Sequence, residues 1–96
     1  MKLYLSDLSY RYEMENLCRL FFPHESIQTH CGELQEPPQG LWAEVAACQN
    51  GTLAVARVGD GEREFGGELS IEPDAGEKET ERCLAVALYR ALCSLT

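Results

Sequence analysis

The chain lacks any long hydrophobic run. None of its apolar stretches approaches the ~20 residues that a membrane-spanning helix needs. Met1-Lys2 leads into a short alternating segment rather than into the apolar core of a signal peptide. The 96 residues are enough for one domain with a modest core. These features predict a single cytoplasmic domain over residues 1–96.

Basic residues are also scarce. Eight Lys and Arg stand against sixteen Asp and Glu, so the net charge is −8. Residues 23–75 carry the whole imbalance, with ten of the acids and two of the bases. Because nucleic-acid binding depends on neutralising phosphates, this charge argues against DNA or RNA as a partner, and against an anionic membrane. The acids either solubilise an exposed sheet face or form a docking face for a basic partner.

The cysteines lack the spacing of a metal or cluster motif. They are Cys18, Cys31, Cys48, Cys83 and Cys93. An odd number at irregular intervals indicates reduced thiols in a cytoplasmic protein. Structural zinc sites take paired ligands two to four residues apart, and the adjacent His30 and Cys31 point to opposite faces of a predicted strand. We therefore predict no metal-binding residue.

Patterns for catalysis and phosphate binding are missing as well. No glycine elbow or basic cluster accompanies any cysteine, so nothing local supports a nucleophile. Gly59-Asp60-Gly61 and Gly66-Gly67 lie between predicted strands, whereas a phosphate loop leads from a strand into a helix. We interpret the first as a turn and the second as a bulge, and predict no catalytic or cofactor-binding residue.

The N-terminal part has clear periodicity. Residues 2–6 alternate polar and apolar side chains, as a strand does. Asp7 or Ser9 can cap the helix that follows, and Pro23 ends it. A second strand is predicted around residues 27–31. The residues expected on one face of the helix are Tyr10, Met14, Leu17 and Phe21.

The remainder predicts a meander and a helix. Asn50-Gly51 between two β-type runs is a strong hairpin signal, and a third strand is expected over residues 63–71. Asp74 and Glu77 match a capping box. The apolar stripe of the last helix comprises Leu84, Ala87, Leu88, Ala91, Leu92 and Leu95. We expect an α+β fold in the order β-α-β-β-β-β-α, an antiparallel-rich sheet with two helices on one face.

Exposed aromatic residues are the best candidates for contact with a partner, because they combine apolar area with a polar tip. The predicted interface consists of Tyr12, Trp42, Tyr89 and Cys93. Core packing is the competing interpretation for Tyr10 and Trp42.

One segment resembles a known family. Residues 8–13 read Leu-Ser-Tyr-Arg-Tyr-Glu and residues 20–23 read Leu-Phe-Phe-Pro. Together with Leu-Tyr-Arg-Ala-Leu at 88–92 and Ser-Leu-Thr at 94–96, this pattern resembles the N-terminal part of bacterial oxygen-independent coproporphyrinogen III dehydrogenases of the HemZ type. These are radical S-adenosylmethionine enzymes of haem synthesis.

The resemblance implies an accessory role. The family oxidatively decarboxylates coproporphyrinogen III to protoporphyrinogen IX, using S-adenosylmethionine and an iron–sulfur cluster held by C-x-x-x-C-x-x-C. This chain has no such motif. It would then be a non-catalytic domain that precedes the catalytic barrel and packs on it or orients it, with both cofactors belonging to the parent enzyme. The apolar stripe that runs to Thr96 without a stop signal also fits a fragment of a longer protein.

The alternative is a stand-alone acidic interaction module with an unknown partner. Such a module would form a homodimer through the meander edge or the last helix.

Overall fold

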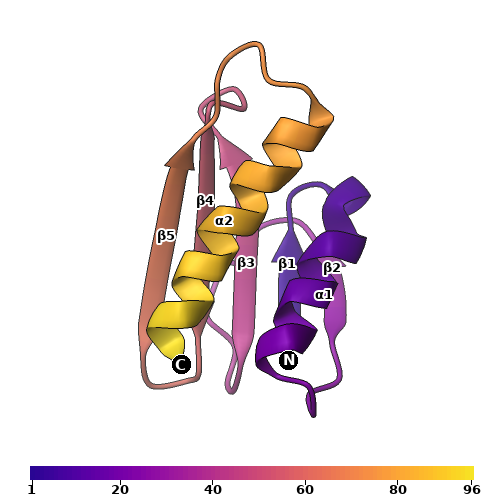
Figure 1. The fold of residues 1–96 in the computed structure, drawn as a ribbon. Coiled ribbons are helices and arrows are strands. Elements are labelled where there is room, and N and C mark those ends of the chain that lie inside the picture. Colours follow the sequence, from indigo (N-terminus) through magenta and orange to yellow (C-terminus); the bar gives the residue numbers. More distant parts are fainter.

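A computed structural model describes residues 1–96, and it confirms the α+β fold and the predicted order of elements (Figure 1). A short 3-10 turn, η1, precedes the first helix. The elements are β1 (Lys2–Leu5), η1 (Leu8–Tyr10), α1 (Arg11–Phe21), β2 (Gln28–Cys31), β3 (Trp42–Cys48), β4 (Leu53–Gly59), β5 (Glu64–Ser70) and α2 (Glu77–Leu95). Both helices cover the same face of the sheet, α1 over β1 and β2 and α2 across β3 to β5.

The sheet is mixed, with strand order β2-β1-β3-β4-β5. The short strand β1 lies between β2 and β3 and pairs parallel with both. The seven-residue strands β3, β4 and β5 pair antiparallel, which is the predicted meander. Parallel pairing of β1 with β2 requires a crossover connection, and α1 provides it.

One hydrophobic core fills the space between the sheet and the helices. Alternate residues of β1, β3, β4 and β5 point into it, including Leu3, Val45 and Val58, which are all almost fully buried. The residues between them, such as Tyr4, Glu44 and Arg57, point to the other face of the sheet. A sheet covered on one side only requires this alternation of side chains.

The first helix follows its predicted pattern only in part. Asp7 caps η1 rather than α1, which has no side-chain cap. Of the predicted apolar face only Met14 is fully buried, while Tyr10, Leu17 and Phe21 are partly buried. The side chain of Asp7 accepts hydrogen bonds from the backbone N–H of Ser9, at 2.9 Å, and from its hydroxyl, at 2.7 Å. Met14 and Cys18 are fully buried, with Phe21 packed against the core. The helix ends two residues before Pro23, because a residue that precedes proline disfavours the helical conformation.

The second helix buries its predicted stripe completely. Its start differs from the prediction, however. Gly76 is the N-cap residue and no side chain caps the helix, so the capping box of Asp74 and Glu77 does not form. Asp74 lies two residues before Gly76, in the turn that leads from β5, and is therefore out of register with the helix.

Two details of the meander also differ from expectation. The loop between β3 and β4 spans four residues, because Cys48 pairs with Leu53, and positive φ angles occur at Gln49 and Asn50 as well as at Gly51. The bulge predicted at Gly66-Gly67 is wrong: the ladder between β4 and β5 continues through both glycines without an extra residue.

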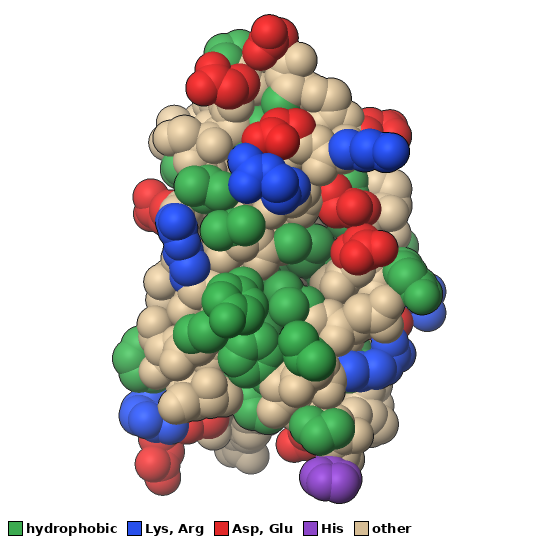
Figure 2. Space-filling view, in the orientation of Figure 1, with side chains coloured by type: hydrophobic (Ala, Val, Ile, Leu, Met, Phe, Trp, Pro, Cys, Tyr) green, Lys and Arg blue, Asp and Glu red, His purple; other side chains and the backbone are tan.

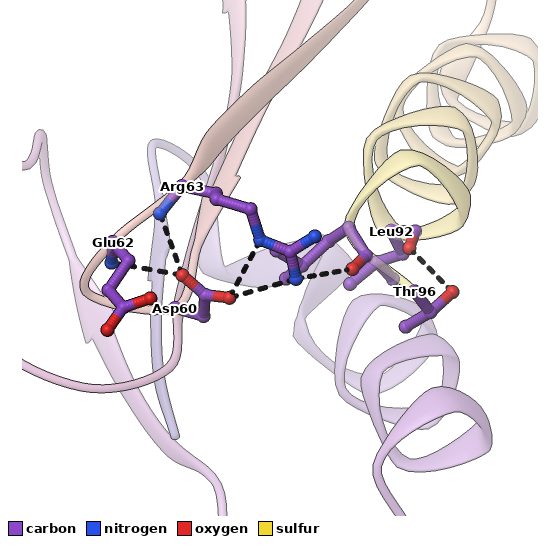
Figure 3. Close-up of polar contacts among 6 residues, drawn as sticks. Asp60, Glu62, Arg63, Leu92 and Thr96 are labelled. Atoms are coloured by element: carbon purple, nitrogen blue, oxygen red, sulfur yellow. Dashed lines mark hydrogen bonds and ion pairs between the residues drawn. The ribbon is translucent and has the colours of Figure 1, made fainter.

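The C-terminal end of α2 has no basic residue of its own, and the guanidinium of Arg63 binds there instead (Figure 3). Arg63, in the turn before β5, donates from Nη2 to the Leu95 carbonyl oxygen at 3.2 Å and to Asp60 Oδ2 at 3.1 Å. Backbone N–H groups of Arg63 and Glu62 bind the Asp60 carboxylate and lower its pKa to about 2. A guanidinium at a helix C-terminus stabilises the exposed carbonyls and the helix dipole.

Candidate interaction surface

A shallow groove separates the two helices on the outer side of the helical layer. It has a volume of about 350 Å³ and is lined by Glu13, Asn16, Leu17 and Leu20 of α1 and Ala85 of α2. Positions 13, 16, 17 and 20 share one side of a helix, so the spacing of the sequence creates this wall. We call these five residues the interhelical groove.

Apolar side chains gather over this layer in the centre of the view in Figure 2. Leu20 exposes 74% of its surface, Tyr12 73% and Tyr89 50%. Isolated exposed apolar residues are ordinary, but several large ones around one groove mark a surface that can bind a partner.

Two of the four predicted interface residues extend the groove along α2. Tyr89 lies one turn after Ala85, and Cys93 lies one turn further, so the three residues form a line. Phe21 of α1 packs edge-on against the Tyr89 ring, with 5.6 Å between ring centroids. The exposed Tyr12 lies on the outward side of α1, one turn before Asn16.

Trp42 is placed apart from the other three. It is on the opposite face of the sheet and only 1% of its surface is exposed, so core-like packing, the competing interpretation, describes it. The Arg57 guanidinium lies 5.7 Å from its ring centroid. Glu44 accepts hydrogen bonds from Arg57 and from the Leu34 N–H at 2.7 Å, which holds the connecting loop against this face. Trp42 therefore presents almost no surface to a partner.

Glu15 is the only buried charged residue, and its environment explains it. It accepts hydrogen bonds from Arg11 Nε at 2.8 Å, from Arg19 Nη2 at 3.3 Å and from the Thr29 hydroxyl of β2. The Thr29 bond is the main cause that lowers the pKa of Glu15, and the arginines add to it. The carboxylate is thus fully partnered and ties α1 to β2, which is a structural role.

The thiols do not form a site for an iron–sulfur cluster. Cys18 and Cys83 are buried, whereas Cys31, Cys48 and Cys93 are exposed at the ends of separate elements. Burial raises the pKa of Cys18 to about 12, so its thiol stays protonated, while cluster ligands must be thiolates. The residues present do not fit such a cluster.

No group of three or more histidine, cysteine or acidic side chains is arranged to hold a metal ion. Every buried side-chain nitrogen and oxygen has a hydrogen-bond partner, so no orphaned polar atom marks a ligand site. Neither helix combines the length and the apolar character required to cross a membrane. Comparison of the chain with protein-family models, curated proteins and solved structures finds no match.

The sequence interpretation missed Leu20 and Ala85 as surface residues. Leu20 directly precedes Phe21 of the predicted apolar face, and this offset places it at the edge of that face rather than at its centre. Ala85 becomes part of a groove only because α1 packs beside α2, and no local pattern indicates that packing.

Proposed function

We propose that this chain is a cytoplasmic, non-catalytic accessory domain of an oxygen-independent coproporphyrinogen III dehydrogenase-like protein of the HemZ type. It packs on the catalytic domain, or orients it, through the interhelical groove and the exposed side chains around it. S-adenosylmethionine and the iron–sulfur cluster belong to the catalytic domain. The observation that carries the proposal is the set of exposed apolar residues on the helix that also carries the family resemblance.

Three further features support the proposal. Tyr12 lies in the Leu-Ser-Tyr-Arg-Tyr-Glu segment and Leu20 begins Leu-Phe-Phe-Pro, so the resemblance and the exposed apolar area coincide on α1. Tyr89 of the Leu-Tyr-Arg-Ala-Leu segment contacts Phe21 and continues the same surface. The side chains of this surface are apolar or neutral apart from Glu13, which suits a dry contact between domains.

The test is association with the separately produced catalytic domain of a HemZ-type dehydrogenase, measured by calorimetry. We expect binding, together with slower amide exchange along the outer side of α1. The double variant Tyr12→Ser, Leu20→Ser should weaken binding about thirtyfold, because two interface anchors that each contribute about 1 kcal/mol together contribute about 2 kcal/mol. Leu53→Ser, a half-exposed leucine on the other face of the sheet, is the matched control and should bind normally.

Two outcomes would refute the proposal. One is the absence of association with the catalytic domain when the domain itself is correctly folded. The other is one-to-one binding of S-adenosylmethionine to this chain alone, which would give it a catalytic rather than an accessory role.

A stand-alone interaction module is the second candidate. The observation in its favour is the acidic meander, whose last strand β5 has only one neighbour in the sheet. A homodimer formed through that edge or through α2 would increase in mass with concentration in light scattering, and a monomer at every concentration would exclude it.

A further inference from the structure

The open edge of β5 presents unpaired backbone groups in a fixed pattern. Asp60 N–H bonds to the Arg63 carbonyl at 3.2 Å and Ile71 N–H bonds to the Thr52 carbonyl at 2.8 Å, which sets the register of the ladder. In an antiparallel pair, hydrogen-bonded positions alternate. The odd-numbered residues of β5 therefore form backbone hydrogen bonds with β4. The even-numbered residues direct their backbone N–H and C=O groups to the open edge, in the plane of the sheet, and they are Glu64, Gly66, Glu68 and Ser70.

Nothing in the sheet lies beyond this edge, and Figure 1 shows β5 as the outermost strand. The contact that reaches the middle of the edge is from Arg90, whose Nη1 lies 3.3 Å from the Glu68 carbonyl oxygen. The bond is long and exposed, so the arginine can move aside. A cationic side chain of this kind is a common protection of an edge strand against unwanted pairing.

Beside the edge is a hollow in the outer face of the sheet. It has a volume of about 450 Å³ and its lining includes Val55, Arg57, Gly66 and Glu68. The hollow exists because Gly66 has no side chain opposite Arg57 on β4. In sheets, an aromatic side chain on a neighbouring strand often covers such a glycine. A guanidinium beside the hollow also favours an aromatic ring.

The side chains next to the hollow are mainly acidic. Glu64 and Glu68 flank Gly66 at two residues on either side and point to the same face, because alternate strand residues share a face. Both are exposed, and Glu68 has no ion-pair partner. Glu64 shares Arg57 with Glu44, with Arg57 Nη1 3.2 Å from Glu64 Oε1. The face therefore has excess negative charge.

From these observations we propose that β5 binds an extended basic segment of another protein as a sixth strand. The segment has an aromatic residue opposite Gly66, covering the hollow, and basic residues two positions before and after it, opposite Glu64 and Glu68. Main-chain hydrogen bonds to the even-numbered residues supply affinity, and the alternate side chains supply specificity. This surface is distinct from the interhelical groove and the proposal does not rest on the accessory function.

A second copy of the chain fits this edge poorly. Symmetric antiparallel pairing centred on Gly66 would place Glu64 of each copy directly opposite Glu68 of the other. Like charges at directly opposite positions destabilise a strand pair. The two glycines would also face each other, so neither hollow would be filled.

The probe is an end-blocked peptide, Thr-Arg-Thr-Tyr-Thr-Arg-Thr, added to the full chain. Amide exchange followed by NMR is the decisive measurement. Without peptide, the N–H groups of Gly66 and Glu68 should exchange quickly while those of Phe65, Gly67 and Leu69 exchange slowly. With peptide, Gly66 and Glu68 should become protected, and a peptide N-methylated at the tyrosine should protect neither.

Variants separate the two sources of specificity. A Cβ at Gly66 would meet only the Ala56 carbonyl oxygen at 3.5 Å, an ordinary contact, so Gly66→Val should fold normally and fill the hollow. We expect it to weaken peptide binding about fivefold, the contribution of one good cross-strand pair. Glu64→Lys with Glu68→Lys should weaken binding by more than about tenfold and favour the peptide in which glutamate replaces arginine.

Each contrary result overturns the proposal. Binding without protection of Gly66 and Glu68 would indicate non-specific attraction to the acids, as would equal binding of a peptide with scrambled sequence. No binding at all would exclude the sixth strand. Protection that increases with protein concentration in the absence of peptide would assign the edge to a second copy of the chain.

Discussion

Replacing Gly66 or Gly67, the adjacent glycines of β5, by alanine is expected to change the stability of the fold in opposite directions. A Cβ on Gly67 would clash with the Ala87 carbonyl oxygen and lie 3.4 Å from the Ala91 backbone nitrogen, both in α2. A Cβ on Gly66 points to the open face and meets no atom closer than 3.5 Å. The pair therefore separates the steric demand of helix packing from the general cost of glycine in a strand.

The magnitudes follow from the geometry. To accept Gly67→Ala, α2 must retreat by about 1 Å across its buried stripe, and overpacking of this kind costs about 1–3 kcal/mol. Gly66→Ala creates no clash and removes the entropic cost of glycine, so it should stabilise the fold by about 0.5–1 kcal/mol. One kcal/mol corresponds to about 4–8 °C in Tm for a domain of this size.

Thermal and urea denaturation followed by circular dichroism would measure both variants against the unchanged chain. We expect Gly67→Ala to melt at least about 4 °C lower and Gly66→Ala to melt at the same temperature or higher. An unaltered Tm for Gly67→Ala would refute the close approach of α2 to β5. Equal losses in both variants would show that glycine is needed for the backbone conformation rather than for the helix contact.

Three further outcomes are expected. Arg63→Gln should lower the free energy of unfolding by about 0.5 kcal/mol in urea denaturation, because it removes the cation at the end of α2. Arg63→Lys keeps a cation there and should lose less stability. Equal stability of both variants and the unchanged chain would contradict the capping role of Arg63. Glu15→Gln should destabilise the chain by about 1–2 kcal/mol at neutral pH, since it weakens charge-assisted bonds to a buried group. The folded-state pKa of Glu15 is lowered from 4.5, so its contribution is present above that pH and is lost as pH falls through the folded-state pKa; denaturation from pH 7 to pH 3 should show a smaller pH dependence for Glu15→Gln. A thiol reagent should label the exposed cysteines quickly and the buried ones only on unfolding. Burial raises the pKa of Cys18 to about 12, and rapid labelling of this thiol would contradict its burial on the inner side of α1.

Much of the fold follows from local pattern. The apolar stripe of α2 determines which side of that helix faces the core, and Pro23 determines where α1 ends. The alternation of three runs separated by turns predicts the meander, because consecutive strands joined by short loops pair antiparallel. The same alternation places Glu64 and Glu68 on an outward face.

The site could be predicted less well. Tyr12, Tyr89 and Cys93 were chosen for residue type and exposure on a helix, and the structure places them around one helical layer. Trp42 is predicted for its residue type beside a proline-rich loop, but it is buried, because its ring packs over Gly59 of β4 and beside the Arg57 guanidinium.

By itself, then, the sequence determined the elements, their order and the faces they bury, since the periods of 2.0 and 3.6 are local properties of the backbone. Tertiary structure alone decided which segments distant in the sequence became neighbours. The parallel pairing of β1 between β2 and β3 depends on distant segments, and so does the cation that Arg63 supplies to α2. The two glycines of β5 are equivalent in sequence and differ only because α2 lies against one of them. Local periodicity specifies which way a side chain points, whereas its contacts depend on what other parts of the chain bring to that side.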